Sequence, residues 1–146
     1  MILIKFKDTF RDRVSEWTLA GAMLGWGLLV LISQNLFIDD PFFKLMIHTT
    51  SQYTWGTVTA IVGMLRITFL IINGAYRPSA HIRAIGCVLG AILWSFLFVS
   101  ALSPTWVAPR TAIYGALLVL ELISLWFAAG DAKLADLLAR GKIRKT

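Results

Sequence analysis

Two charged residues lie inside long apolar stretches of the chain, Arg66 and Glu121. A charge buried in lipid is costly, and by default it marks a partner or a polar pathway. Arg66 lies seven residues before Asn73 and Glu121 lies eight before Ala129, near the ends of two apolar segments that run in the same direction. At about 1.5 Å of rise per residue, the two charges lie at depths that agree within one helical turn. The spacing therefore predicts an intramembrane ion pair.

Three roles are open for this pair. The two side chains could form a structural staple that orients two helices, or they could line a polar path or a gate. Alternatively, Arg66 could extend to the nearby headgroups, because long basic side chains carry their charge to the interface.

Other residue types that perform chemistry are few and scattered. His48 and His81 fall on opposite sides of the predicted membrane, so they cannot share a site. The single cysteine, Cys87, has no CxxC partner, which excludes an intrachain disulfide and favours a small buried apolar residue. The sequence contains no phosphate-binding loop, no HExxH motif and no GxSxG turn. We therefore expect no enzymatic activity, no metal site and no cofactor.

The composition gives the class of the protein. The chain has 146 residues, of which 58% are hydrophobic and only 15% charged, and its mean hydropathy is +0.73. An average soluble domain is about 45–50% apolar and about 25% charged. A chain of this size cannot hide such an excess from water, so a soluble enzyme, a nucleic-acid-binding domain and a disordered protein are all disfavoured. The net charge of +6 is placed in flanks and loops, where it indicates membrane orientation and not binding to nucleic acid.

Four apolar segments have the length of about 17–25 residues that a spanning helix needs. We expect these spans over residues 17–33, 55–73, 84–102 and 111–129 of a single integral membrane domain. Unbroken apolar runs favour helices over the alternating strands of a barrel. The predicted fold is an all-α bundle of four transmembrane helices in the lipid bilayer.

The distribution of basic residues predicts the orientation of the spans. The two loops on one side, 34–54 and 103–110, carry only Lys44 and Arg110. The segments 1–16, 74–83 and 130–146 hold Lys5, Lys7, Arg11, Arg13, Arg77, Arg83, Lys133, Arg140, Lys142, Arg144 and Lys145. Because cytoplasmic loops are enriched in Lys and Arg, both termini are predicted to be cytoplasmic. Four tryptophans then fall near the two interfaces as anchors: Trp17 and Trp126 on the inner side, Trp55 and Trp106 on the outer side.

Glycines at a spacing of four residues predict close contact between helices. Gly21 and Gly25 form such a pair in the first span, with Gly27 just beyond, and Gly86 and Gly90 form another in the third. In the second span, small residues line one side: Gly56, Ala60 and Gly63. Small residues let helix backbones approach closely in lipid, where no hydrophobic driving force between helices exists. These contacts could close the bundle or join two copies of the chain, and we expect the first.

The segments between the spans carry local signals. Residues 1–16 have an apolar stripe that suits an amphipathic helix lying on the inner leaflet. In the outer loop, Asp40 can cap a short helix that begins at Pro41, and we expect this helix to press onto the outer interface. In the inner loop, Pro78 bars a continuous helix, and Arg77 and Arg83 are predicted to hold the hairpin at the inner surface.

Three stretches together suggest a family. They are NGAYRPSAHIRA between the second and third spans, WTLAGAMLGWGLLVL near the start, and TAIYGALLVLELISLWFAAGDAKLAD near the end. The chain resembles small four-span membrane proteins encoded by tailed bacteriophages and prophages of Gram-negative bacteria, which are similar to holins in size and span number. The resemblance implies a bacterial inner-membrane protein and brings no catalytic residues.

Three functions are consistent with these features. The first is membrane permeabilisation or lysis timing by homo-oligomerisation, as in holins. The second is an envelope binding protein that engages a host membrane protein or blocks superinfection. The third is a subunit or assembly factor of a larger membrane complex. The spans offer few polar faces, which counts against a wide pore lined by a single chain.

Overall fold

The protein is an all-α bundle, and the computed structural model describes residues 13–75, 80–102 and 109–140. Four helices in it are long and apolar enough to cross a membrane. They are α2 (Val14–Ile32), α5 (Gln52–Ala75), α6 (Ala80–Ala101) and α7 (Pro109–Ala139). Three short helices follow α2: α3 (Leu36–Asp39), the 3₁₀ helix η1 (Pro41–Phe43) and α4 (Lys44–Thr49). This is the architecture of a multi-pass membrane protein.

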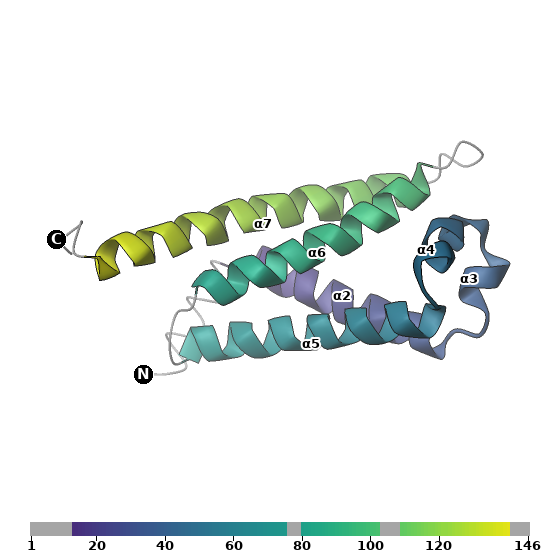
Figure 1. Ribbon diagram of the computed structural model, residues 1–146, viewed down its shortest axis with the longest axis horizontal. Coiled ribbons are helices and arrows are strands. Elements are labelled where there is room, and N and C mark those ends of the chain that lie inside the picture. Colours follow the sequence, from purple (N-terminus) through teal and green to yellow (C-terminus); the bar gives the residue numbers. More distant parts are fainter. Residues whose placement is uncertain (1–12, 76–79, 103–108, 141–146) are drawn as a thin grey trace.

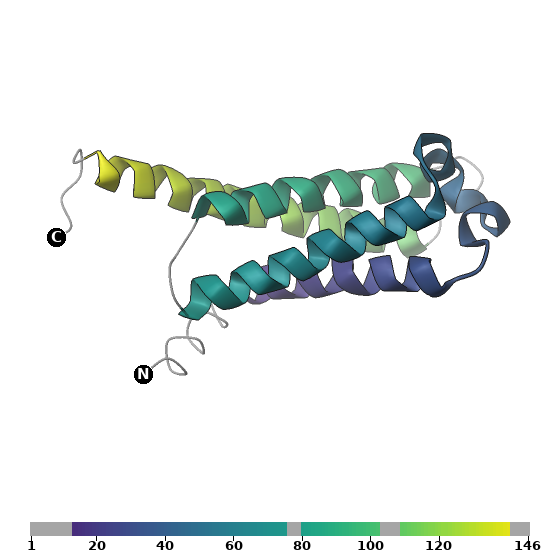
Figure 2. The same cartoon turned by 60° about the horizontal axis from the view of Figure 1, so that its bottom comes forward.

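The four long helices form two closely packed pairs. α2 packs along α5, and α6 packs along α7, whereas the two pairs approach each other less closely (Figures 1 and 2). The short helices α3, η1 and α4 cover one end of the bundle, which we call the cap end. α2 begins and α7 ends at the opposite end, which we call the termini end.

In the first helix pair, the predicted small-residue side of α5 is confirmed as a close contact, whereas the Gly21 and Gly25 pair of α2 is not part of it. A Cβ added to Gly27 of α2 would collide with the backbone of Ala60 in α5. One added to Gly63 of α5 would lie 2.5 Å from the backbone nitrogen of Leu24. No neighbouring atom lies within 4 Å of a Cβ placed on Gly21 or on Gly25. The prediction that those two glycines contact other helices of the bundle was therefore wrong, because α2 turns a different face toward α5.

The cap end is closed by aromatic side chains. Asp40 Oδ1 accepts a hydrogen bond from Phe42 N at 2.9 Å, with Pro41 at the first helical position, so the predicted cap is confirmed. The rings of Phe37 and Phe43 stack at 4.6 Å between centroids. Phe42, Phe43 and Met46 are buried in the core. The short helices are thus folded over the end of the bundle, and their expected position at the outer interface stays a prediction.

A buried amide ties this cap to the first helix pair. Gln52, the first residue of α5, accepts a hydrogen bond from Phe37 N at 3.0 Å. Its Nε2 donates to Val30 O at 2.9 Å and to Ser33 O at 2.6 Å. These three bonds satisfy backbone groups at the end of α2 and the start of α3, which would otherwise be buried without partners.

The helices are longer than the predicted spans at most ends. The largest difference is in α7, where a span over 111–129 was expected and the helix has 31 residues. At about 1.5 Å per residue it is about 46 Å long, which exceeds a hydrocarbon core of about 30 Å. At the termini end, α7 accordingly continues past the residue where α6 begins, Ala80 (Figures 1 and 2). Some predictions fall outside the described residues. They concern most of the amphipathic helix expected over 1–16, and the predicted sites Arg77, Pro78 and Trp106.

Candidate functional site

The two charges singled out in the sequence meet in the centre of the bundle. Arg66 of α5 donates to Glu121 of α7 through two nitrogens, Nη1 to Oε2 at 2.9 Å and Nη2 to Oε1 at 2.7 Å. The indole Nε1 of Trp94 in α6 donates to the same Oε2 at 3.1 Å. Glu121 is 0% exposed and Arg66 is 6% exposed. A carboxylate that is removed from solvent thus receives three hydrogen bonds, two of them in the paired geometry that arginine favours.

Soft and small residues complete the surroundings of this pair. Arg66 Nη1 also lies 3.0 Å from the sulfur of Met23, and Nη2 lies 3.9 Å from the sulfur of Cys87. Cys87 is buried, as the sequence indicated. A Cβ on Gly90 would collide with the Glu121 carboxylate and would lie 2.5 Å from Arg66 Nη1. A Cβ on Gly86 would lie 3.2 Å from Arg66 Cγ.

Gly86 and Gly90 therefore have a role that differs from the predicted one. They were expected to let two helix backbones approach each other, but the atoms nearest to them belong to the charged side chains. Their missing side chains leave the volume that the Arg66 guanidinium and the Glu121 carboxylate occupy.

A second charged cluster lies nearer the termini end. Arg83 of α6 forms an ion pair with Glu16 of α2 through Nη2, and its Nε donates to Glu16 Oε2 at 3.0 Å. Its Nη1 lies 2.8 Å from Oδ2 of Asp131 in α7. Arg83 was predicted to hold a hairpin at the membrane surface, and this was wrong: the residue is buried. Two carboxylates from neighbouring helices draw the guanidinium into the bundle.

A third ion pair lies at the cap end. Arg110, near the start of α7, lies 3.0 Å from Asp40 Oδ2. Its guanidinium carbon also lies 4.8 Å from the centre of the Phe42 ring, in the geometry of a cation–π contact. Both charged side chains are partly exposed.

Three ion pairs, Arg66–Glu121, Arg83–Glu16 and Arg110–Asp40, join the same two halves of the molecule. The half formed by α2, α5 and the cap contributes Glu16, Arg66 and Asp40. The half formed by α6 and α7 contributes the opposite charges, Arg83, Glu121 and Arg110. The additional pair between Arg83 and Asp131 lies within this second half. Each half carries cations and anions in an order that matches the other. Since lipid provides no hydrophobic drive between helices, this order favours one register of the two halves.

Two spaces lie between the central pair and the termini end. A cavity of about 20 Å³ lies between the two buried clusters and is lined by residues that include Arg66, Arg83 and Cys87. That volume is enough for about one water molecule. A hollow of about 410 Å³ at the termini end is lined by charged and hydroxyl side chains: Arg13, Ser15, Glu16, Arg83, Ser124 and Asp131, with Phe127. Toward the cap end the core is built from aromatic and aliphatic side chains.

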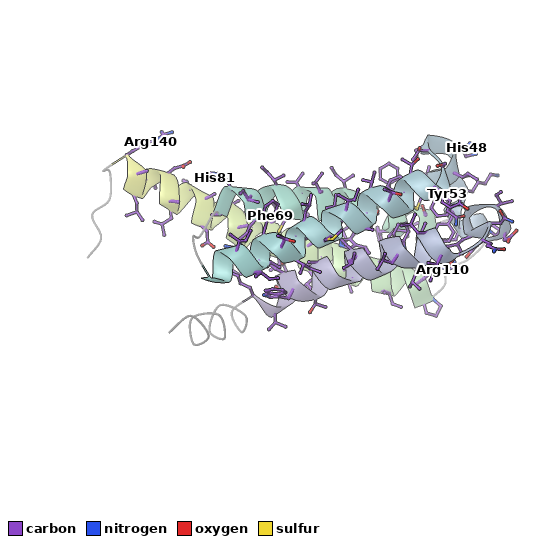
Figure 3. The ribbon with its side chains drawn as sticks, turned by 90° about the horizontal axis from the view of Figure 1, so that it is seen from below. His48, Tyr53, Phe69, His81, Arg110 and Arg140 are labelled. Carbon is purple, nitrogen blue, oxygen red and sulfur yellow. The ribbon has the colours of Figure 1, made fainter. Side chains whose placement is uncertain are left out.

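The remaining candidate residues do not gather into a site. His48 lies at the cap end and His81 lies toward the termini end (Figure 3), where its Nε2 is 3.2 Å from Asp136. Across residues 13–75, 80–102 and 109–140, no group of three or more His, Cys, Asp or Glu is placed to hold a metal ion.

The tryptophans predicted as interface anchors differ in their surroundings. Trp126 is 80% exposed on α7. The indole Nε1 of Trp55 donates to Met46 O at 3.1 Å, so this ring holds the short helix α4 against α5. Trp17 is partly buried near the start of α2.

Four functional residues escaped the sequence analysis: Glu16, Gln52, Trp94 and Asp131. Glu16 and Asp131 lie just beyond the apolar runs, where an acidic residue is unremarkable in a sequence. Trp94 lies in the middle of a span, away from both interfaces where tryptophan is usually found. That position was the one signal that its N–H needs a buried acceptor.

Comparisons of the chain with protein-family models, with curated proteins and with solved structures give no match, so any function must be argued from the residues described above.

Proposed function

We propose that this protein acts by associating with other helices in the bacterial inner membrane, with both termini in the cytoplasm. Membrane permeabilisation by homo-oligomerisation, of the kind that phage holins perform, is the leading form of this function. The observation that carries the proposal is the division of the molecule into a charged interior and an apolar exterior. The buried charges pair with one another, while the outward faces of the long helices carry large aliphatic and aromatic side chains.

One outward face is suited to helix association. Gly21 and Gly25 lie on α2 with no neighbouring atom within 4 Å of where a Cβ would be. The spacing of these two glycines allows another helix to approach the α2 backbone closely. Since no residue in 13–75, 80–102 or 109–140 covers this position at the two glycines, a helix from another chain is the natural partner in this proposal.

Permeabilisation requires several copies of the chain. In the described residues the core toward the cap end is aromatic and aliphatic, and Arg66 and Glu121 neutralise each other. Several associated copies could form a lumen between them. The charged clusters could line it only after the two helix halves separate, because the Arg66–Glu121, Arg83–Glu16 and Arg110–Asp40 pairs join one half to the other.

The second candidate is a binding protein or assembly factor that engages a host membrane protein. It is favoured by the same internal compensation of charge, because a bundle with paired charges has no need to open. In this case the apolar exterior would bind one specific partner.

Induced expression in bacterial cells with a membrane-potential dye separates the two candidates. The leading candidate predicts depolarisation by the wild-type chain and its loss in Gly25→Leu, which blocks close approach while leaving the bundle's own contacts intact. Gly130→Leu is the matched control, because Gly130 on α7 also has nothing within 4 Å of an added Cβ. It should depolarise like wild type.

Two other outcomes of the expression and crosslinking measurements would decide between permeabilisation and partner binding, or remove the role of the α2 face. Full membrane potential, together with a single membrane protein crosslinked to the wild-type chain but not to Gly25→Leu, would favour the binding protein. If the two leucine variants behave alike in both measurements, the α2 face has no role and the proposed association through it is wrong.

A further inference from the structure

A groove at the cap end combines an apolar wall with a basic rim. It lies between the short helix α4 and the end of α6, and its volume is about 380 Å³. Phe42, Leu45 and Val99 form apolar parts of its lining, and Lys44 and His48 supply the basic groups. Figure 3 shows His48 at this end of the molecule.

The basic rim is available to an external anion. Lys44 and His48 are four residues apart in α4, so they project from the same side of the helix. Both are exposed, and neither forms an ion pair with a described residue. In the cap, the carboxylate of Asp40 is engaged by Arg110 at 3.0 Å. The charge of Lys44 at this groove therefore has no ion-pair partner among the described residues.

The depth of the groove matches the level of lipid headgroups. Val99 lies two residues before the end of α6 at Ala101, and its side chain is 54% exposed. Its apolar surface continues along the lipid-facing side of α6, where Ile92 is 50% exposed. Lys44 and His48 lie beyond this apolar surface, at the end of the span. An acyl chain on the wall and a phosphate at the rim would fit this order.

We infer that this groove binds an anionic glycerophospholipid of the leaflet at the cap end. One acyl chain packs against Phe42, Leu45 and Val99, and Lys44 and His48 donate hydrogen bonds to the phosphate and headgroup. The apolar wall favours a lipid over a free phosphate ion. The basic rim favours an anionic lipid over a second apolar helix. The inference is independent of the proposed function, since it concerns neither the α2 face nor the ion pairs.

The molecule contains a comparison groove without charge. An apolar hollow of about 330 Å³ on α7 is lined only by Val119, Leu122, Ile123, Trp126 and Phe127. Lipid there has no basic group to recognise. It should therefore be occupied with no preference between headgroups.

The test is native mass spectrometry of the purified full chain in mild detergent. Phosphatidylglycerol and phosphatidylcholine with identical acyl chains are added in equal amounts. We expect phosphatidylglycerol to be retained preferentially. Each interfacial cation contributes about 1 kcal/mol to attraction of anionic lipid, which corresponds to roughly fivefold in binding. Lys44→Gln with His48→Gln should therefore reduce the preference at least roughly fivefold.

Two further variants test the apolar wall. Val99→Trp fills the groove and should weaken retention of both lipids, while Val119→Trp, the control in the comparison groove, should leave the preference for phosphatidylglycerol unchanged. Equal retention of the two lipids by wild type, or a preference that survives the Lys44 and His48 substitutions, would overturn the inference. Displacement of the bound lipid by inorganic phosphate would show a phosphate site instead and would also overturn it.

Discussion

Glu121→Leu should destabilise the bundle strongly, because it removes the acceptor of three hydrogen bonds at once. Arg66 donates two of them and Trp94 donates the third. Both donors remain in the interior, and Arg66 is only 6% exposed. An unpaired charge left in a buried site costs about 3–5 kcal/mol in soluble proteins. Hydration from the small cavity beside Arg66 and local deformation of the bilayer can reduce this cost, so the expected loss lies toward the lower end of that range.

Arg66→Leu should have a comparable effect, because Glu121 would keep only the hydrogen bond from Trp94. The double variant should recover much of either loss, since an apolar pair has no charge to compensate. Recovery should be incomplete. The indole N–H of Trp94 would be left buried without an acceptor, which costs about 1–3 kcal/mol.

A double-mutant cycle compares the stability of wild type, Arg66→Leu, Glu121→Leu and the double variant. Each protein is unfolded at equilibrium in mixed micelles by titration with a denaturing detergent, and tryptophan fluorescence follows the transition. Glu121→Gln serves as a control, because its amide oxygen can still accept from Trp94 or from Arg66. It should be less damaging than Glu121→Leu. If the losses in the double variant simply add, the two residues are not energetically coupled. In that case the reasoning from the ion pair fails.

The other predictions concern packing, the cap and the orientation. Gly27→Ala should cost about 1–3 kcal/mol in the same unfolding assay, because the new methyl collides with the Ala60 backbone. Its control, Gly25→Ala, should not lower the stability, because no described atom lies within 4 Å of the added methyl. Equal losses in the two variants would contradict the packing of the Gly27 face of α2 against α5. Gln52→Leu should lower stability by about 1–3 kcal/mol by leaving buried backbone groups of the cap unpaired, and an unchanged midpoint would remove that role. Alkaline phosphatase fused at Gln52 should be active, and fused at Thr146 inactive; the reverse pattern would refute cytoplasmic termini.

The sequence alone was sufficient to predict the number of long helices and the pairing of Arg66 with Glu121. Four apolar runs of membrane-spanning length indicated four helices, and the structure contains four. Arg66 and Glu121 were predictable as partners because two conditions could be checked from the chain alone. They lie at similar depth in helices that run in the same direction, and a charge in an apolar run needs a partner.

The face that each helix turns inward was decided only by tertiary structure. In a soluble protein the polar side of a helix shows which face is exposed, but in lipid both faces are apolar and this signal is lost. The glycine pair at Gly21 and Gly25 was therefore expected inside the bundle, whereas Gly27 is the residue of α2 that contacts the small-residue side of α5.

The second cluster also required the fold. Glu16, Arg83 and Asp131 lie in three different helices and are far apart in the sequence. Each one taken singly looks like an ordinary charged residue near the end of a span. Depth along the membrane can be counted from a sequence, because the rise of a helix per residue is constant. The rotation of each helix about its own axis cannot be counted in the same way, because it depends on how the side chains of all four helices pack together.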